Sequence, residues 1–216
     1  MHLQRKAIIA IAAALQLCGC GGGSSEQAKR RLPTVTEEQR KTMHGTCYSS
    51  EYDVTPTACS QGFLLDVANG RVYKNGRLVQ LKKDPDTGNY LDTDVADGEK
   101  YTYGLRSIGG NSNTVCYIST PRISTATMNG HSLDIRWNVP VNAGSYEYYA
   151  VVGSAGKFGP FRADSGKATI DIGKHYEQLK ESTKKKGYGM VTVYAQKAET
   201  DRTYESGPDA MYFWVK

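Results

Sequence analysis

Short runs in which apolar and polar residues alternate, separated by glycine, asparagine and aspartate, make up much of the chain beyond residue 60. Side chains along a strand point alternately to opposite faces, so a period of two is typical of a half-buried strand. In the segment 70–81 two such runs flank Asn75 and Gly76, a dipeptide typical of a two-residue hairpin. Further runs at 90–108 and 114–120 follow after turn residues. This spacing of strands favours a β-sandwich.

Alternation is more regular in the second half of the chain. Residues 131–140 place Leu133, Ile135 and Trp137 on one face. Further strands are predicted at 146–154, 167–173, 190–199 and 209–216. Between the strands at 167–173 and 190–199 lies "KHYEQLKESTKKKGYG", which predicts a helix from about His175 to Lys185. The pattern therefore predicts an all-β protein with one short helical insertion.

The N-terminus has the pattern of a secretory signal. Arg5 and Lys6 precede an apolar run at 7–17, which corresponds to the charged and apolar regions of such a signal. The apolar run has eleven residues, whereas a helix that spans a bilayer needs about 20. We therefore expect this signal to be removed and any membrane attachment to be covalent or through a partner.

The sequence Leu17-Cys18-Gly19-Cys20 resembles the lipobox of bacterial lipoproteins. The resemblance implies cleavage between Gly19 and Cys20, and lipidation of Cys20. An alternative frame ending at Cys18 places Gln16 and Leu17 beside the cleaved bond, where a peptidase selective for small residues would reject them. An ordinary secretory signal remains the second alternative. Several buried acyl chains, at about 0.8 kcal/mol per CH₂ group, would make release negligible.

The residue after the lipidated cysteine bears on localisation. Gly21 stands where many lipoproteins of the inner membrane carry aspartate. The resemblance therefore implies an anchored protein of the bacterial cell envelope and favours the outer membrane, facing either the periplasm or the surface. The polar, glycine-led residues up to 45 predict a flexible tether.

The segments "RVYKNGRLV" and "YLDTDVADGEKYTYGLRSI" resemble the second half of a fibronectin type III module. This resemblance implies that Tyr101 is a corner tyrosine, with its ring in the core and its hydroxyl bonded to the preceding turn. Residues 46–69 lack the tryptophan-bearing strand of that fold. The first module, at 46–119, is therefore either truncated or a different small β unit supported by a disulfide.

The segment "HSLDIRWNVP" closely resembles strand B of fibronectin type III domains, in which Trp137 would be the core tryptophan. The resemblance implies an immunoglobulin-like sandwich at 120–216. It also implies that the helical insertion replaces the turn that normally carries the corner tyrosine. The chain is thus divided into a signal peptide at 1–19, a lipidated cysteine with a tether at 20–45, and two β modules.

Net charge and cysteine content bear on the class of partner and on the redox compartment of the protein. Removal of residues 1–19 takes away two of the 27 basic residues, and 25 − 22 leaves a formal charge of +3. This charge is dispersed, so we expect no nucleic-acid partner. Cys47, Cys59 and Cys116 remain for an oxidising compartment. A Cys47–Cys59 disulfide would close a small loop worth about 3 kcal/mol, and a Cys59–Cys116 disulfide is the open alternative.

Motifs for catalysis or metal binding are not found in the sequence. The four histidines have no second ligand at metal spacing, and no nucleophile, phosphate-loop or dinucleotide motif is present. The segment "DPDTGNYLDTD" is interpreted as turn chemistry, with a calcium loop as the alternative. We therefore expect a non-enzymatic protein without cofactor or metal.

Tyrosine is frequent, with 15 residues in the chain. An exposed tyrosine on a sheet can bind protein or glycan through its ring and hydroxyl. The candidate binding surface comprises Tyr146, Tyr148 and Tyr194. The leading hypothesis is a membrane-anchored lipoprotein acting as a binding or spacer module for a protein or glycan partner. A glycan-binding accessory protein and an envelope enzyme are the alternatives.

Overall fold

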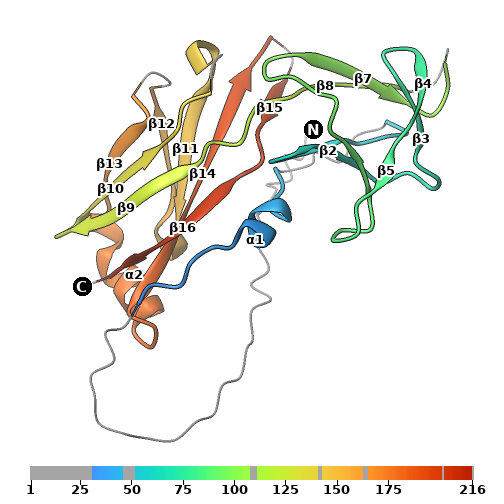
Figure 1. Ribbon diagram of the computed structural model, residues 1–216. Coiled ribbons are helices and arrows are strands. Elements are labelled where there is room, and N and C mark those ends of the chain that lie inside the picture. The colour runs from blue at the N-terminus through green and yellow to red at the C-terminus, as the bar shows by residue number, and fades with distance from the viewer. Residues whose placement is uncertain are drawn as a thin grey trace, which may run out of the picture.

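The computed structural model describes residues 31–45, 52–107, 111–140, 143–162, 165–200 and 202–215. Within these ranges the protein is mostly β, as the alternating pattern predicts, and it is built from antiparallel sheets (Figure 1). The predicted sites at Gly19, Cys20 and Cys47 lie outside the described residues.

Two four-stranded sheets form the first module. One contains, in order, β1 (Thr57–Cys59), β2 (Gly62–Leu65), β6 (Tyr90–Asp92) and β5 (Lys82–Lys83). The other contains β4 (Arg77–Gln80), β3 (Arg71–Lys74), β7 (Lys100–Gly104) and β8 (Asn113–Cys116). The turn between β3 and β4 has positive φ at Asn75 (50°) and Gly76 (77°), as a type I′ hairpin requires. The predicted hairpin is confirmed.

Tyr101 is the second residue of β7 and follows the turn that leads into that strand. Its hydroxyl accepts a hydrogen bond from the Ala96 N–H at 2.8 Å, and its ring meets Phe63 edge-on with the centroids 6.4 Å apart. Phe63 is 2% exposed and belongs to the core of this module. Tyr101 thus makes the backbone contact that a corner tyrosine is expected to make.

The second module packs a three-stranded sheet against a larger one. The first sheet contains β13 (Lys167–Asp171), β10 (Ser132–Trp137) and β9 (Ile123–Asn129). The second contains β12 (Gly156–Phe161), β11 (Glu147–Val152), β14 (Tyr188–Ala198) and β15 (Thr203–Glu205), and β16 (Asp209–Trp214) also pairs with β14. The five predicted strands coincide with β10, β11, β13, β14 and β16 to within a few residues.

The core of the second module lies between its sheets. Trp137 is 4% exposed, and its ring centroid lies 5.3 Å from that of Tyr148. The inward residues of β14 are fully buried, as their alternation predicts: Val191, Val193 and Ala195. Helix α2 (Tyr176–Thr183) lies within the predicted range 175–185, and its Leu179 is fully buried in the same core. The insertion therefore closes one end of the sandwich.

Residues 31–45, which we call the N-terminal arm, belong to the folded body. Helix α1 (Glu37–Lys41) has a capping box between Thr36 and Gln39, and Val35 is 6% exposed. At the end of the arm the Gly45 N–H donates to the Ala58 carbonyl at 2.9 Å. The prediction of a flexible tether up to residue 45 is therefore wrong for 31–45. The contacts responsible join residues far apart in sequence, which a local pattern does not indicate.

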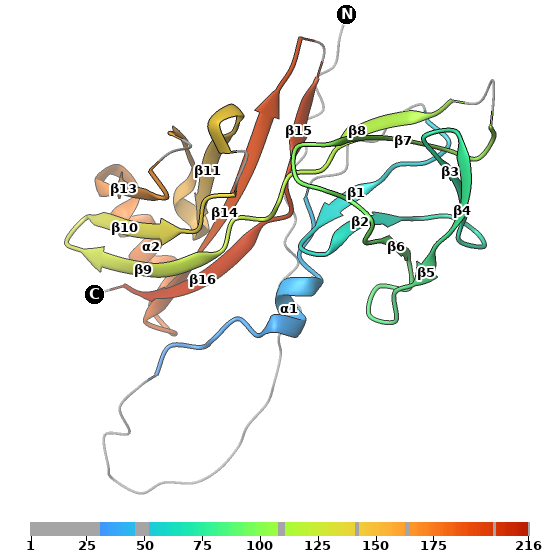
Figure 2. The same cartoon turned by 45° about the horizontal axis from the view of Figure 1, so that its top comes forward.

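The arm runs along the second module. In Figures 1 and 2 its first residues, in dark blue, lie at the end of the second module where α2 and the C-terminal end of β16 are found. It then passes along β16 to α1, close to where the two modules meet. The first module occupies the opposite end of the molecule.

Candidate functional site

The two modules are joined by polar contacts as well as by the chain at residue 120. The Asp97 carboxylate accepts from the Ser119 N–H at 2.6 Å and from the Tyr146 hydroxyl at 3.2 Å. The Arg202 guanidinium donates to the Thr114 carbonyl at 2.9 Å. We call this region the module junction. Because its contacts come from several strands of both modules, it fixes their relative orientation.

Glycine at position 207 allows a close approach within the junction. A Cβ atom there would lie 2.8 Å from the Thr120 Oγ1 atom and 3.0 Å from the Cys59 Cα atom. The first distance is shorter than real Cβ contacts, and the second, to a backbone atom, is shorter than most of them. The chain after β15 can therefore lie against the first module only because Gly207 has no side chain.

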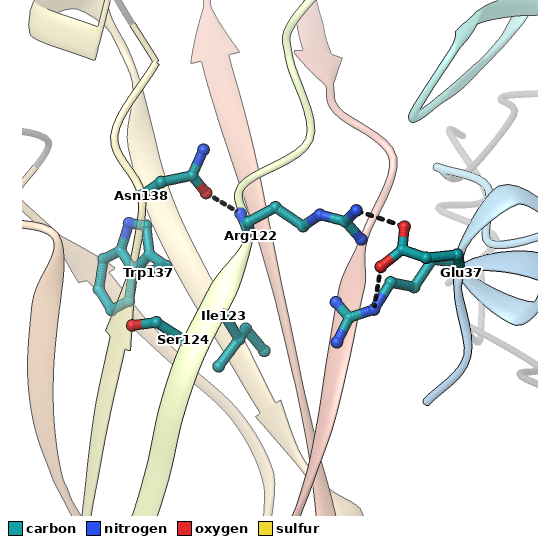
Figure 3. A pocket seen from close by; sticks show the side chains of 7 residues that line it. Glu37, Arg122, Ile123, Ser124, Trp137 and Asn138 are labelled. Carbon is teal, nitrogen blue, oxygen red and sulfur yellow. Dashed lines mark hydrogen bonds and ion pairs between the residues drawn. The ribbon is translucent and has the colours of Figure 1, made fainter. Parts of the chain in front are cut away.

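Two ion pairs hold α1 against the second module, and Figure 3 shows the one between Arg122 and Glu37. Arg40 pairs with Asp209, whose side chain is 1% exposed, and the second Asp209 oxygen accepts from the Ile123 N–H at 2.7 Å. Arg122 pairs with Glu37, whose pKa is lowered chiefly because the guanidinium donates a hydrogen bond to the carboxylate. The arm is therefore attached by one buried and one exposed pair.

A hollow of about 440 Å³ lies beside these pairs. It is lined by Glu37, Arg40, Arg122, Ile123, Ser124, Trp137 and Asn138. The Asn138 side-chain oxygen accepts from the Arg122 N–H (Figure 3). Because the charged groups that line the hollow are paired with protein groups, we interpret it as the seam along which the arm docks.

A second hollow of about 390 Å³ lies in the first module, with a buried polar group at its base. The Lys74 side chain is 9% exposed, and its Nζ atom lies 2.9 Å from Asp92 Oδ2. The Tyr103 hydroxyl donates to the same oxygen at 2.6 Å, and burial together with this bond raises the Tyr103 pKa. The exposed side chains of Lys82 and Lys83 also line this hollow.

The aspartates beside this hollow make turn contacts, as expected. The Asp84 carboxylate accepts from the Thr87 N–H at 3.1 Å and from the Thr87 hydroxyl at 2.6 Å. Among the residues that the structure describes, no group of three or more histidine, cysteine, aspartate or glutamate side chains is arranged to hold a metal ion.

The predicted binding surface of Tyr146, Tyr148 and Tyr194 is wrong, because these side chains are 3%, 0% and 5% exposed. Tyr146 closes on Asp97 at the module junction. Tyr148 faces the core, where it packs against Trp137. Neither side chain is open to a partner.

Tyr194 does point away from the core, as alternation predicts, but its neighbours cover it. Tyr149 is directly opposite on β11, and the two rings stack with centroids 5.8 Å apart. The Lys157 Nζ atom lies 3.9 Å from the Tyr149 ring centroid and 5.4 Å from that of Tyr194. Burial raises the pKa of Tyr194 to about 12. The Tyr194 side chain is therefore covered, whereas Tyr149 above it is partly exposed.

Farther along the outer face of the same sheet, where β14 pairs with β16, lie aromatic residues that the sequence pattern alone does not group together. Tyr188 on β14 contacts two residues of β16: its ring centroid lies 5.4 Å from that of Tyr212 and 6.3 Å from that of Trp214. All three are partly exposed. We call them the aromatic cluster. Their signal in the sequence is the even spacing along β14, which places Tyr188 on the same face as Tyr194.

Cys59 and Cys116 are buried free thiols in the structure. Burial raises the pKa of both, which makes them weak nucleophiles. The alternative Cys59–Cys116 disulfide is therefore not formed, and the partner proposed for Cys59, Cys47, lies outside the described residues.

Comparisons with known proteins identify no family for this chain, so its function is inferred from the structure and the sequence. In the part of the chain that the structure describes, no helix is both long and apolar enough to cross a membrane. No protein-family model matches the chain, and no curated protein is similar to it in sequence.

Proposed function

We propose that this protein is a non-enzymatic lipoprotein of the bacterial cell envelope in which the second module is a spacer and the first module is presented to a partner. The acyl anchor is Cys20, which the lipobox-like residues Leu17 to Cys20 support. The glycine and serine residues that follow allow the body to stand off from the bilayer.

The observation that carries this proposal is the path of the N-terminal arm. The arm leaves the α2 end of the second module and reaches the first module only after passing α1 (Figures 1 and 2). The buried Arg40–Asp209 pair holds it in this position. A chain anchored upstream of Arg31 would therefore have the second module nearest the anchor and the first module farthest from it.

The architecture of the second module suits a spacer. The sheet orders β13-β10-β9 and β12-β11-β14-β15 support the proposed likeness to fibronectin type III domains. The module junction fixes the first module on this sandwich through Asp97 and Arg202. A spacer of this kind needs no ligand of its own, because sandwiches of this architecture have many unrelated roles.

The first module carries the surface that we propose for the partner. Leu78 on the edge strand β4 is 48% exposed, and the partly exposed Tyr73 lies directly opposite it on β3. Because side chains alternate along a strand, Leu78 and Tyr73 lie on the sheet face opposite to Lys74 and the hollow that it lines. An exposed leucine beside a partly exposed tyrosine on an edge strand is typical of a protein-binding surface.

The anchor is tested by Cys20→Ala, with Cys18→Ala as the matched control. We expect Cys20→Ala to abolish incorporation of labelled palmitate and to make the protein extractable from the membrane fraction by high salt. Cys18→Ala should change neither. Equal labelling of the Cys20→Ala variant and the unchanged protein would refute the anchor.

The presented surface is tested by site-specific photo-crosslinking in intact cells. A crosslinker at Leu78 should capture a defined partner, whereas one at the exposed Arg136 of the spacer should not. Capture of the same proteins from both positions would contradict the division into spacer and presented module.

A further inference from the structure

We infer that the α2 end of the second module is a membrane-contacting surface that binds anionic lipid headgroups. The surface consists of Lys184, Lys185 and Lys186 together with the aromatic cluster of Tyr188, Tyr212 and Trp214. The inference rests on the proposed lipid anchor, which would bring this end to the bilayer.

The basic and aromatic residues are joined at one end of the sandwich by a tight connection between α2 and β14. The Gly187 N–H donates to the Thr183 carbonyl at 2.7 Å, and Gly187 has a positive φ of 75°. Its carbonyl accepts from the Val215 N–H at 3.0 Å, which brings the end of β16 alongside. Tyr188 is directly opposite Trp214 in the sheet. The three lysines therefore lie next to the aromatic cluster.

Positive charge is concentrated at this end. Lys184, Lys185 and Lys186 are exposed. The segment 174–188 contains five lysines and two glutamates, so 5 − 2 gives a formal charge of +3, equal to the charge of the whole chain beyond residue 19. The only ion pair that the described structure shows for the three lysines is Lys184 with the exposed Glu181, at 3.4 Å. Basic clusters of this kind are attracted to anionic leaflets.

The aromatic cluster supplies the second type of residue that a bilayer interface selects. Tyrosine and tryptophan are enriched where proteins meet the headgroup region, because the ring enters the apolar zone while the polar tip stays hydrated. The edge-to-face contacts of Tyr188 with Tyr212 and Trp214 hold the three partly exposed rings together. Lysine and aromatic side chains together favour a lipid surface over a neutral glycan.

The position of the arm agrees with this orientation. The N-terminal arm begins at the same end of the molecule in both views (Figures 1 and 2). From Cys20 to Arg31 the chain has 31 − 20 = 11 residues, which reach at most about 37 Å when fully extended. A flexible chain of that length has an r.m.s. span of about 18 Å. The lysines are thus within reach of the surface that holds the anchor.

The test separates this surface from the anchor by using the full chain with Cys20→Ala. Vesicles of phosphatidylethanolamine and phosphatidylglycerol are the probe, and phosphatidylcholine vesicles are the neutral reference. We expect co-sedimentation with the anionic vesicles that weakens as salt is raised. Changing Lys184, Lys185 and Lys186 to Gln should lower the partition coefficient about 100-fold, at about fivefold per lysine.

A matched control removes three exposed basic residues from the first module: Arg71→Gln, Lys82→Gln and Lys83→Gln. This control should bind the anionic vesicles as strongly as the Cys20→Ala protein. Equal weakening by the two triple changes would overturn the inference, because it would show attraction by net charge alone. Failure of the Cys20→Ala protein to bind anionic vesicles at low salt would overturn it as well.

Trp214 provides an independent readout. Lipids brominated near the headgroup should quench its fluorescence, and Trp214→Phe should abolish that quenching because Trp137 is 4% exposed. Retention on a polysaccharide that is lost in Trp214→Phe, without quenching by lipid, would instead assign the surface to a glycan. If the unchanged chain incorporates no labelled palmitate, the proposed anchor is refuted. The vesicle and quenching measurements would still decide whether the α2 end binds lipid.

Discussion

Arg40→Ala removes one partner of the ion pair that holds the N-terminal arm against the second module. The Asp209 carboxylate would keep its bond from the Ile123 N–H at 2.7 Å. It would lose the guanidinium that neutralises it at a site where the Asp209 side chain is 1% exposed. We therefore expect the loss in stability to come mainly from a charge left buried without its counter-ion.

The magnitude follows from this burial. Removing one partner of a buried ion pair costs about 3 to 5 kcal/mol, a large part of the roughly 5 to 15 kcal/mol by which proteins of this kind are stable. With an m-value of about 2 kcal/mol per molar urea, the unfolding midpoint should fall by about 2 M. Adding Asp209→Asn to Arg40→Ala should recover part of this loss, because the remaining group is then uncharged.

Equilibrium urea unfolding of the full chain, with Cys20→Ala for solubility, measures these changes. Glu37→Gln is the matched control on the same helix, because its partner Arg122 is exposed, and it should leave the midpoint unchanged. A fall of less than 0.5 M for Arg40→Ala, or the same fall for Glu37→Gln, would show that the arm is not held by a buried charge pair.

Three further predictions concern the cores and the junction. Tyr103→Phe should cost about 1.5 to 3 kcal/mol in urea unfolding, because it removes the donor to the buried Asp92 carboxylate. Burial raises the pKa of Tyr117, Tyr148 and Tyr194 to about 12. Because tyrosines of the unfolded chain release their protons near pH 10, the free energy of unfolding should fall from about pH 10 to pH 12. Ultraviolet titration of the folded chain should show tyrosines that ionise near pH 12. Gly207→Ala should loosen the module junction, seen as faster proteolysis between the modules, whereas unchanged proteolysis would contradict the close packing there.

Local patterns predict the elements of this protein, and contacts between distant residues decide its surfaces. The Asn75-Gly76 hairpin follows from the φ values that those two residues tolerate. The strand β14 follows from alternation, because its inward residues Val191, Val193 and Ala195 are fully buried. Both signals depend on neighbours in the chain, so the sequence alone is sufficient for them.

The exposed fraction of an outward residue depends on what other strands place over it. Alternation turns Tyr194 outward, but its burial under Tyr149 and Lys157 depends on the pairing of β11 with β14 and with β12. Likewise Arg40 and Asp209 are 169 positions apart, so a polar segment with an isolated short helix gives no local sign that it docks. The predicted tether and the place of Tyr194 in the predicted surface are wrong for this reason, whereas Tyr148 is wrong because it faces the core.

Docking of the arm would determine which end of the protein faces the anchor proposed at Cys20. If the arm were free up to Gly45, the linker from Cys20 would have 45 − 20 = 25 residues instead of 11. The effective concentration of the folded body at the membrane falls as about the −3/2 power of linker length. The shorter linker of the docked arm therefore raises this concentration only about threefold. The exit point changes more: a free arm would leave from Gly45, which lies against Ala58 and Ser206 near the module junction, and either module could then meet the bilayer. With α1 docked, the chain leaves at the α2 end of the second module (Figures 1 and 2), so in the proposed anchored protein the Arg40–Asp209 pair contributes orientation more than proximity.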